Sequence, residues 1–132
     1  MTDPTQVLVI ASQTRQCKRV VLALDQLGFK VRLAFTLAEA QATLESEHFP
    51  VVCSSTELID GTYRDVLEIL LSRSLATRLL VISPRDDNSE YLEAMELGAF
   101  DLLPCDCAPS EVERILRNAM ACTGPLQHAA SA

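Results

Sequence analysis

The chain has 132 residues, enough for one domain with its own hydrophobic core, and 48% of them are hydrophobic. Its formal net charge is −7, from 18 acidic and 11 basic side chains, which argues against a nucleic-acid interface or an anionic membrane surface. Residues 1–6 lack the pattern of a secretion signal and no apolar segment reaches the length of a membrane span, so we expect a cytoplasmic protein.

Five short apolar segments, spaced as in strand–helix units, are predicted strands. The first, Val7–Ile10, is apolar at every position rather than at alternate ones, which is typical of a parallel strand covered on both faces. The other four are Val31–Ala34, Val51–Cys53, Leu79–Ile82 and Asp101–Leu103.

Segments with helical periodicity lie between these strands. The first has apolar residues from Cys17 to Leu27 at helical spacing, with Gly28 as a stop. Thr36–Glu39 and Ser110–Glu113 are capping boxes that open the second and fifth helices. The third helix is predicted from about Tyr63 to Arg73, and the fourth from about Asp87–Ser89 to Gly98.

A strand followed by a helix, repeated five times with right-handed crossovers, predicts an α/β doubly wound three-layer sandwich around a parallel sheet. Such sheets place their functional residues beyond the carboxyl ends of the strands. We expect one domain over residues 1–120. Residues 121–132 lack periodicity and contain Gly124 and Pro125, so they are predicted to be a tail or a linker.

Three motifs, in order and at suitable spacing, carry a resemblance to a known family. They are the run Gly98–Leu103, the strand Leu79–Ser83 and the loop Leu58–Gly61. Together they resemble response-regulator receiver domains over residues 5–120. The resemblance implies a five-stranded parallel sheet in the order 2-1-3-4-5 with five helices. It also implies phosphoryl transfer to an aspartate, assisted by Mg²⁺, a lysine and a hydroxyl.

The residues at the corresponding positions differ from the family pattern. The acidic pair that follows the first strand falls on Ala11 and Ser12, and the phosphoacceptor falls on Ser55. The lysine falls on Cys105, and the aromatic switch residue falls on Leu102. The resemblance therefore implies a vestigial phosphoacceptor pocket.

Two positions of this pocket keep a family feature. Ser83 keeps the hydroxyl, and Glu57 keeps the position whose backbone carbonyl binds the metal in the family. A shift in alignment does not restore the rest, because the only lysines are Lys18 and Lys30 and no acid lies between Asp3 and Asp25. We therefore expect no metal, no cofactor and no catalytic residue.

These observations lead to the hypothesis of a pseudo-receiver, a non-enzymatic protein-interaction or dimerisation module of a bacterial two-component or phosphorelay-type signalling or transcription regulator. An output domain is expected to follow it. In the family, the surface of the fourth helix, fifth strand and fifth helix commonly forms a homodimer. Its candidate residues here are Glu93, Glu96, Leu102, Arg114 and Arg117.

Three alternatives stay open. Cys53, Cys105 and Cys107 come toward one edge of the predicted sheet, which could give a thiol-based redox or metal-sensing module. However, five scattered cysteines in a chain with an adequate core are typical of reduced, structurally inert thiols. The second alternative is an atypical receiver that is still phosphorylated. The third is a small-molecule binding module that uses the vacated pocket.

Overall fold

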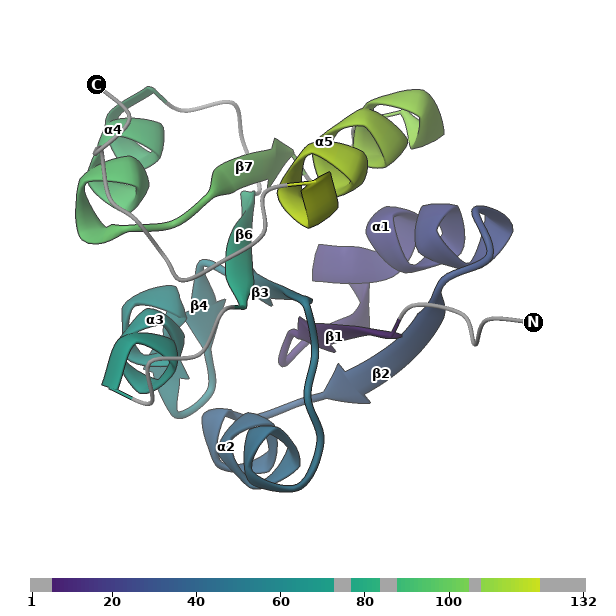
Figure 1. The fold of residues 1–132 in the computed structure, drawn as a ribbon. Helices are drawn as coiled ribbons and strands as arrows, with labels where there is room; N and C mark the ends of the chain where they lie inside the picture. The colour runs from purple at the N-terminus through teal and green to yellow at the C-terminus, as the bar shows by residue number, and fades with distance from the viewer. Residues whose placement is uncertain (1–5, 73–76, 84–87, 105–107, 122–132) are drawn as a thin grey trace.

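The centre of the molecule is a five-stranded parallel sheet in the order β2-β1-β3-β6-β7 (Figure 1). The computed structural model describes residues 6–72, 77–83, 88–104 and 108–121. The strands are β1 (Gln6–Ile10), β2 (Lys30–Ala34), β3 (Val51–Ser55), β6 (Arg78–Ser83) and β7 (Asp101–Pro104). This confirms the predicted doubly wound fold and the strand order 2-1-3-4-5.

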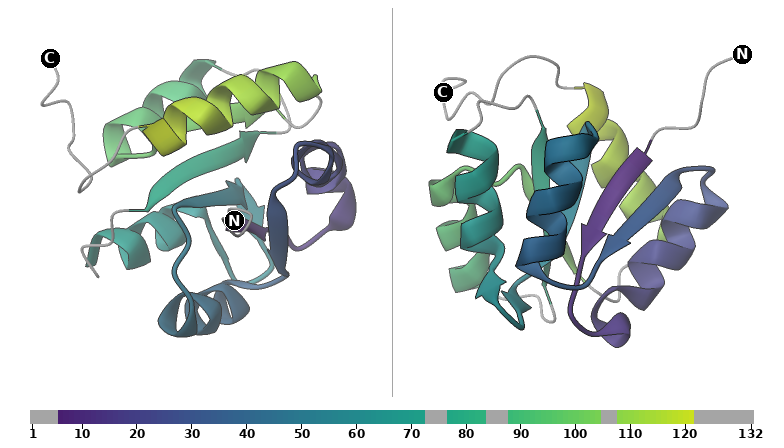
Figure 2. Two further views of the ribbon diagram at one scale, coloured as in Figure 1. Left: turned by 45° about the vertical axis from the view of Figure 1, so that its right-hand side comes forward. Right: turned by 90° about the horizontal axis from the view of Figure 1, so that it is seen from below.

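Five helices cover the two faces of the sheet, so the fold has three layers (Figure 2). The helices are α1 (Thr14–Gln26), α2 (Leu37–Ser46), α3 (Tyr63–Ser72), α4 (Asn88–Leu97) and α5 (Pro109–Ala121). Helices α1 and α5 pack together on one face, while α2, α3 and α4 lie on the other (Figure 1). None of the described helices combines the length and the apolar content needed to cross a membrane.

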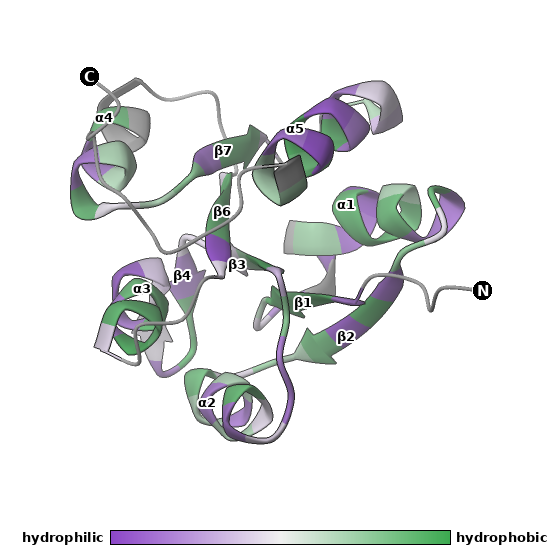
Figure 3. Ribbon diagram, viewed as in Figure 1, coloured by the Kyte–Doolittle hydropathy of each residue, from purple (hydrophilic) through white to green (hydrophobic). Residues whose placement is uncertain are grey.

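The apolar strands divide their side chains between two hydrophobic clusters. Along β1, Val7 and Val9 pack under α1 and α5, whereas Leu8 and Ile10 pack under α2 and α3. All four are fully buried, as expected for a strand with helices on both faces. The edge strand β2 differs, because hydrophilic and hydrophobic residues alternate along it (Figure 3).

Two helices end at glycines with positive φ, as their sequences predict. Gly28 follows α1 with φ +90°, and Gly98 follows α4 with φ +112°. Glycine populates this region without the steric penalty that a Cβ atom brings. The helix ends thus direct the chain back toward the sheet, where Phe29 and Ala99 are the next residues to pack into the core.

A short antiparallel hairpin between β3 and α3 was not predicted. It consists of β4 (Glu57–Leu58) and β5 (Gly61–Thr62), joined by Ile59 and Asp60. A Cβ atom at Gly61 would lie 2.9 Å from Cδ2 of Leu37 and 2.7 Å from a carboxylate oxygen of the α3 residue Asp65. A larger residue at Gly61 would therefore have to displace the ends of the Leu37 and Asp65 side chains.

The Gly28→Ala variant should lose about 1 to 2 kcal/mol of unfolding free energy, because the added methyl group disfavours positive φ. Nothing lies within 4 Å of the added Cβ, so steric contact with the rest of the chain does not contribute. Urea unfolding monitored by circular dichroism measures the loss. Gly98→Ala should show a similar loss, and an unchanged midpoint in both variants would contradict this account of the helix ends.

Candidate functional site

The carboxyl ends of three neighbouring strands, β1, β3 and β6, hold most of the predicted site residues. Ala11 directly follows β1, Ser55 ends β3 and Ser83 ends β6. Their exposed fractions are 3%, 2% and 0%, so the edge is closed by buried side chains. The structure thus brings these three residues together. The fourth strand-end position, Cys105, lies outside the described residues.

Ser12 ties together three loops at this edge. Its hydroxyl donates a hydrogen bond to the carbonyl oxygen of Phe35, at 2.8 Å, at the end of β2. The same hydroxyl accepts a hydrogen bond from the backbone amide of Ile59, at 2.7 Å, in the turn of the β4–β5 hairpin. A neutral hydroxyl therefore connects the β1–α1, β2–α2 and β4–β5 loops directly, with backbone groups as its partners.

The carboxylate of Asp60 caps helix α2. Its two oxygens accept hydrogen bonds from the backbone amides of Leu37, at 2.7 Å, and Ala38, at 3.1 Å. These bonds hold the pKa of Asp60 below its ordinary value. Thr36 satisfies the amide of Glu39 at 3.0 Å, so two side chains share the capping of the first turn.

The remaining polar groups of the edge bind mainly to the backbone. The hydroxyl of Ser54 donates to the carbonyl oxygen of Ser55 at 3.0 Å. The hydroxyl of Ser55 donates across the sheet to the carbonyl oxygen of Ile10, at 3.4 Å. Glu57 lies on the hairpin with an exposed side chain. The buried part of the described edge is therefore built from hydroxyls and backbone groups rather than from carboxylates.

No described residues form a group of three or more His, Cys, Asp or Glu side chains placed to hold a metal ion. Mg²⁺ takes charged oxygen ligands because it gives up its water shell reluctantly. At the described edge, Asp60 is engaged by the start of α2 and Ser12 by two loops. The donor set there does not match a magnesium site.

Cys53 lies in the hydrophobic core rather than at the carboxyl edge. Cys53 is a fully buried residue of β3 and packs under α1 and α5, in the same cluster as Cys17. Burial, with a smaller contribution from Cys17, raises the pKa of the Cys53 thiol to about 12. Burial also raises the pKa of Cys17. The thiolate is the reactive form of cysteine, so both thiols are inert at neutral pH.

The predicted interaction surface contained one residue that the structure removes from it. Leu102 is only 7% exposed, so its assignment to the surface was wrong. It is paired with Val81 of β6, and its side chain therefore points into the cluster that contains Ala94 of α4 and Ala99. Sheet register, which the sequence pattern does not specify, decides this orientation.

Three charges of the same predicted surface have partners within the chain. Glu93 forms an ion pair with Arg64 of α3, at 2.5 Å. Within α5, Arg114 pairs with a glutamate one turn earlier, and Arg117 pairs with another at 2.6 Å. Glu96 is exposed. The complementary charges on which that surface was predicted are thus largely satisfied without a second copy.

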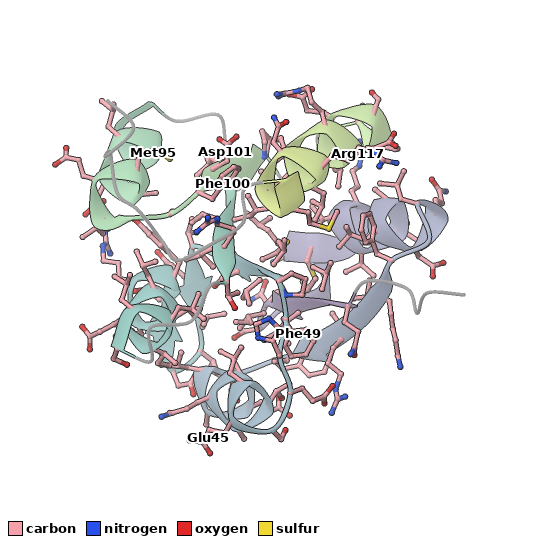
Figure 4. All side chains as sticks on the ribbon, in the orientation of Figure 1. Glu45, Phe49, Met95, Phe100, Asp101 and Arg117 are labelled. Atoms are coloured by element: carbon pink, nitrogen blue, oxygen red, sulfur yellow. The ribbon has the colours of Figure 1, made fainter. Side chains whose placement is uncertain are left out.

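A hollow of about 280 Å³ lies at the opposite edge of the sheet, between the end of α2 and the starts of β3 and β6. Thr77 and Phe49, two residues of its lining, precede β6 and β3 respectively. Phe49 lies in the interior and Glu45 on the outward side of α2 (Figure 4). Because its lining precedes the strands, this hollow is separate from the carboxyl edge.

Asp60→Asn should lower the melting temperature at neutral pH, because the amide offers one acceptor oxygen and no charge to the start of α2. The folded-state pKa of Asp60 is depressed, so its stabilisation is complete above about pH 3.9 and is lost as pH falls through the folded pKa. The difference from wild type should therefore shrink below about pH 3.9, as measured by thermal unfolding. Glu57→Gln on the same hairpin is the control, with little expected effect at neutral pH. A difference that widens in acid would contradict the capping role.

Cys17 and Cys53 should react slowly with iodoacetamide in the folded protein and rapidly after unfolding, because burial suppresses both access and thiolate formation. Peptide mass spectrometry after timed alkylation measures each cysteine separately. Equal rates for Cys53 in the folded and unfolded chain would show that the strand β3 thiol is accessible.

The sequence missed the network that Ser12, Phe35, Ile59 and Asp60 form. The Asp60–Gly61 pair was recognised only as a motif match. The Asp60–Gly61 pair nevertheless indicates a turn, because aspartate and glycine are both common turn residues. What no pattern indicated is the contact of this turn with α2.

Comparison with known proteins agrees with this architecture. No protein-family model matches the chain. The chain is 27% identical over 110 residues to the acid tolerance regulatory protein ActR of Rhizobium meliloti (strain 1021), covering 83% of this chain and 55% of ActR. It is 27% identical over 99 residues to the photosynthetic apparatus regulatory protein RegA of Cereibacter sphaeroides, covering 75% and 54% respectively. The chain thus spans about half the length of the curated relatives it matches.

Solved structures resemble the chain over nearly its whole length. The chemotaxis response regulator CheY4 of Vibrio cholerae superposes with a TM-score of 0.76 at 19% identity, covering 88% of this chain and 98% of CheY4. The non-phosphorylated HemR receiver domain from Leptospira biflexa gives a TM-score of 0.76 at 22% identity, covering 92% and 98%. The chain therefore has the receiver, or CheY-like, fold of response regulators.

Proposed function

We propose that the chain is a non-enzymatic receiver domain of a two-component or phosphorelay-type signalling or transcription regulator that works without phosphorylation. Its role is to bind a protein partner or a second copy. The observation that carries this proposal is the position of Ser12, a neutral residue that joins three loops where the family places an acidic metal ligand.

Phosphoryl transfer is catalysed by positive charge placed around the phosphoryl oxygens, supplied in receivers by Mg²⁺ and a lysine. In this chain the two positions after β1 hold a methyl group, at Ala11, and a hydroxyl, at Ser12. Neither carries the charge that attracts a divalent cation. The lysine position holds Cys105, a residue without an ammonium group. These residues support a pocket without the required electrostatics.

Ser55 is a poor substitute for the aspartate acceptor. A serine hydroxyl needs a neighbouring base before it can act as a nucleophile. The hydroxyl of Ser55 donates a hydrogen bond to the backbone carbonyl oxygen of Ile10, at 3.4 Å. The described histidine, His48, lines the hollow at the opposite edge of the sheet and cannot serve it.

Three loops at the carboxyl edge, β1–α1, β2–α2 and β4–β5, are held by hydrogen bonds that need no ion and no modification. This supports a partner that recognises a constant surface rather than a phosphorylated state. Since the matched segment makes up only 55% of ActR and 54% of RegA, both of them regulatory proteins, we propose that an output domain belongs to the full-length protein. A cytoplasmic location is part of the same proposal.

The alternatives receive less support. Cys53 is sequestered in the core, which weakens the thiol-based sensor, and Cys105 and Cys107 lie outside the described residues. A homodimer through α4, β7 and α5 stays a prediction. However, Leu102 is buried, and most charged residues of that surface form ion pairs within the chain. The vacated pocket as a ligand site has no specific observation in its favour.

Incubation with acetyl phosphate and Mg²⁺ should leave the intact mass of the protein unchanged. Mg²⁺ alone should also leave its melting temperature unchanged, since a ligand of the folded state would raise it. A phosphorylatable receiver, such as Vibrio cholerae CheY4, treated in parallel serves as the positive control. An adduct of one phosphoryl group on this chain, mapped to Ser55 or to any residue of the edge, would refute phosphorylation independence.

A further inference from the structure

Two residues with large exposed apolar side chains are brought together at the carboxyl edge through their backbones. Phe35 is 47% exposed and Ile59 is 79% exposed. Their backbones share the hydroxyl of Ser12, which is 2.8 Å from the carbonyl oxygen of Phe35 and 2.7 Å from the amide nitrogen of Ile59. We name this pair the loop platform. Adjacent exposed apolar groups in a soluble domain are typical of a contact surface.

The loop platform is fixed before any partner arrives. Ile59 lies in the turn of the β4–β5 hairpin, and Asp60 anchors that turn to the start of α2 through two hydrogen bonds. Phe35 is held from its other side, because its amide donates to the carboxylate of Glu39 at 2.8 Å. A rigid apolar surface loses little conformational entropy on binding, which favours association.

Negative charge surrounds the loop platform. The carboxylates are those of Glu39, Glu57, Asp60 and Asp65, all on exposed residues. Where they are hydrogen-bonded, their partners are neutral backbone amides, so the negative charge remains. The neighbouring cation, Arg64, is engaged by a carboxylate of α4. The surface that fits the loop platform is therefore basic, with an apolar group at its centre.

The outward face of α1 has these two properties. Arg15, Lys18, Arg19 and Leu22 follow one another at i, i+3, i+4 and i+7, so they share one side of the helix. All four are exposed, and Leu22 is 51% exposed. Asp25 is the only acidic residue of α1. This basic face stands out on a chain whose net charge is −7. We name it the α1 face.

We propose that the α1 face of one copy binds the loop platform of a second copy. Leu22 packs against Phe35 and Ile59, while the cations of α1 meet the surrounding carboxylates. Strand β2 also has exposed basic residues and an exposed leucine, Leu33, but Arg32 is paired there with Glu47, whereas α1 carries three basic residues on one side. The inference rests on the proposed interaction function and names its partner. Since it does not involve phosphorylation, its failure would leave phosphorylation independence standing.

Two unlike patches make this contact, which sets its symmetry. A two-fold dimer makes the contact twice, and otherwise the contact closes into a ring or propagates into an open filament. In both arrangements a copy with a damaged α1 face keeps a working loop platform. Likewise, a copy with a damaged loop platform keeps a working α1 face. This property separates the proposed contact from a dimer through α4, β7 and α5, where like surfaces meet.

Sedimentation velocity over a range of protein concentrations tests the proposal. The wild-type chain should form dimers or larger species, and association should weaken as salt rises toward about 1 M, where the Debye length falls to about 3 Å. Leu22→Asp and Ile59→Asp should each weaken association by at least about tenfold. Leu92→Asp, at a 59% exposed leucine of α4, is the matched control and should associate like wild type.

Mixing the two defective variants gives the decisive result. Leu22→Asp supplies an intact loop platform and Ile59→Asp supplies an intact α1 face. The mixture should therefore form a heterodimer at concentrations at which each variant alone stays monomeric. Circular dichroism spectra matching wild type establish that the variants are folded. A wild-type chain that stays monomeric at all concentrations would overturn the proposal. So would a mixture without heterodimer, or association lost in Leu92→Asp but kept in the other two.

Discussion

The two hydrogen bonds of the Ser12 hydroxyl hold three loops of the carboxyl edge in place. This hydroxyl lies where three loops meet and offers a donor to Phe35 and an acceptor to Ile59, at short distances. Both partners are backbone groups, which would otherwise need water or another side chain at the same place. Because the link is neutral, the arrangement of the loops does not require a bound cation. A single neutral side chain thus joins three loops of the edge.

The fold rests on features that are separate from the charge of the carboxyl edge. The fold follows from apolar strands buried on both faces, such as β1 and β3, and from helices that end at Gly28 and Gly98. Ala11 belongs to the core cluster and Ser55 ends β3, so both are buried with this scaffold while carrying no charge. A scaffold of this kind can keep its architecture while its site changes, so the functional conclusion has to come from the site.

Carboxylates near the edge do not by themselves indicate metal chemistry. Asp60 is close to Ser12 in space but binds the start of α2, where the amides and the helix dipole stabilise its charge. Its role is structural, and it keeps the hairpin in place. The carboxylates near the β4–β5 hairpin are negatively charged, whereas the exposed face of α1 is positively charged. The net charge of −7 does not reveal this separation of charge on the surface.

The sequence alone determined the layers, the strand order through its family resemblance, the helix ends and the capping of α2 by Thr36, since these follow from local patterns within a few residues. The capping box expected at Ser110–Glu113 was wrong, because α5 begins at Pro109 and the carbonyl oxygen of Ala108 accepts its first hydrogen bonds. It also located Ala11, Ser12, Ser55 and Ser83 at one edge. Only the tertiary structure decided the bonds of Ser12, which join residues 23 and 47 positions apart. The same is true of the burial of Leu102, the β4–β5 hairpin and the pairing of Glu93. These depend on register and on which loops come together, and both are fixed by the packing of the whole chain rather than by any local pattern.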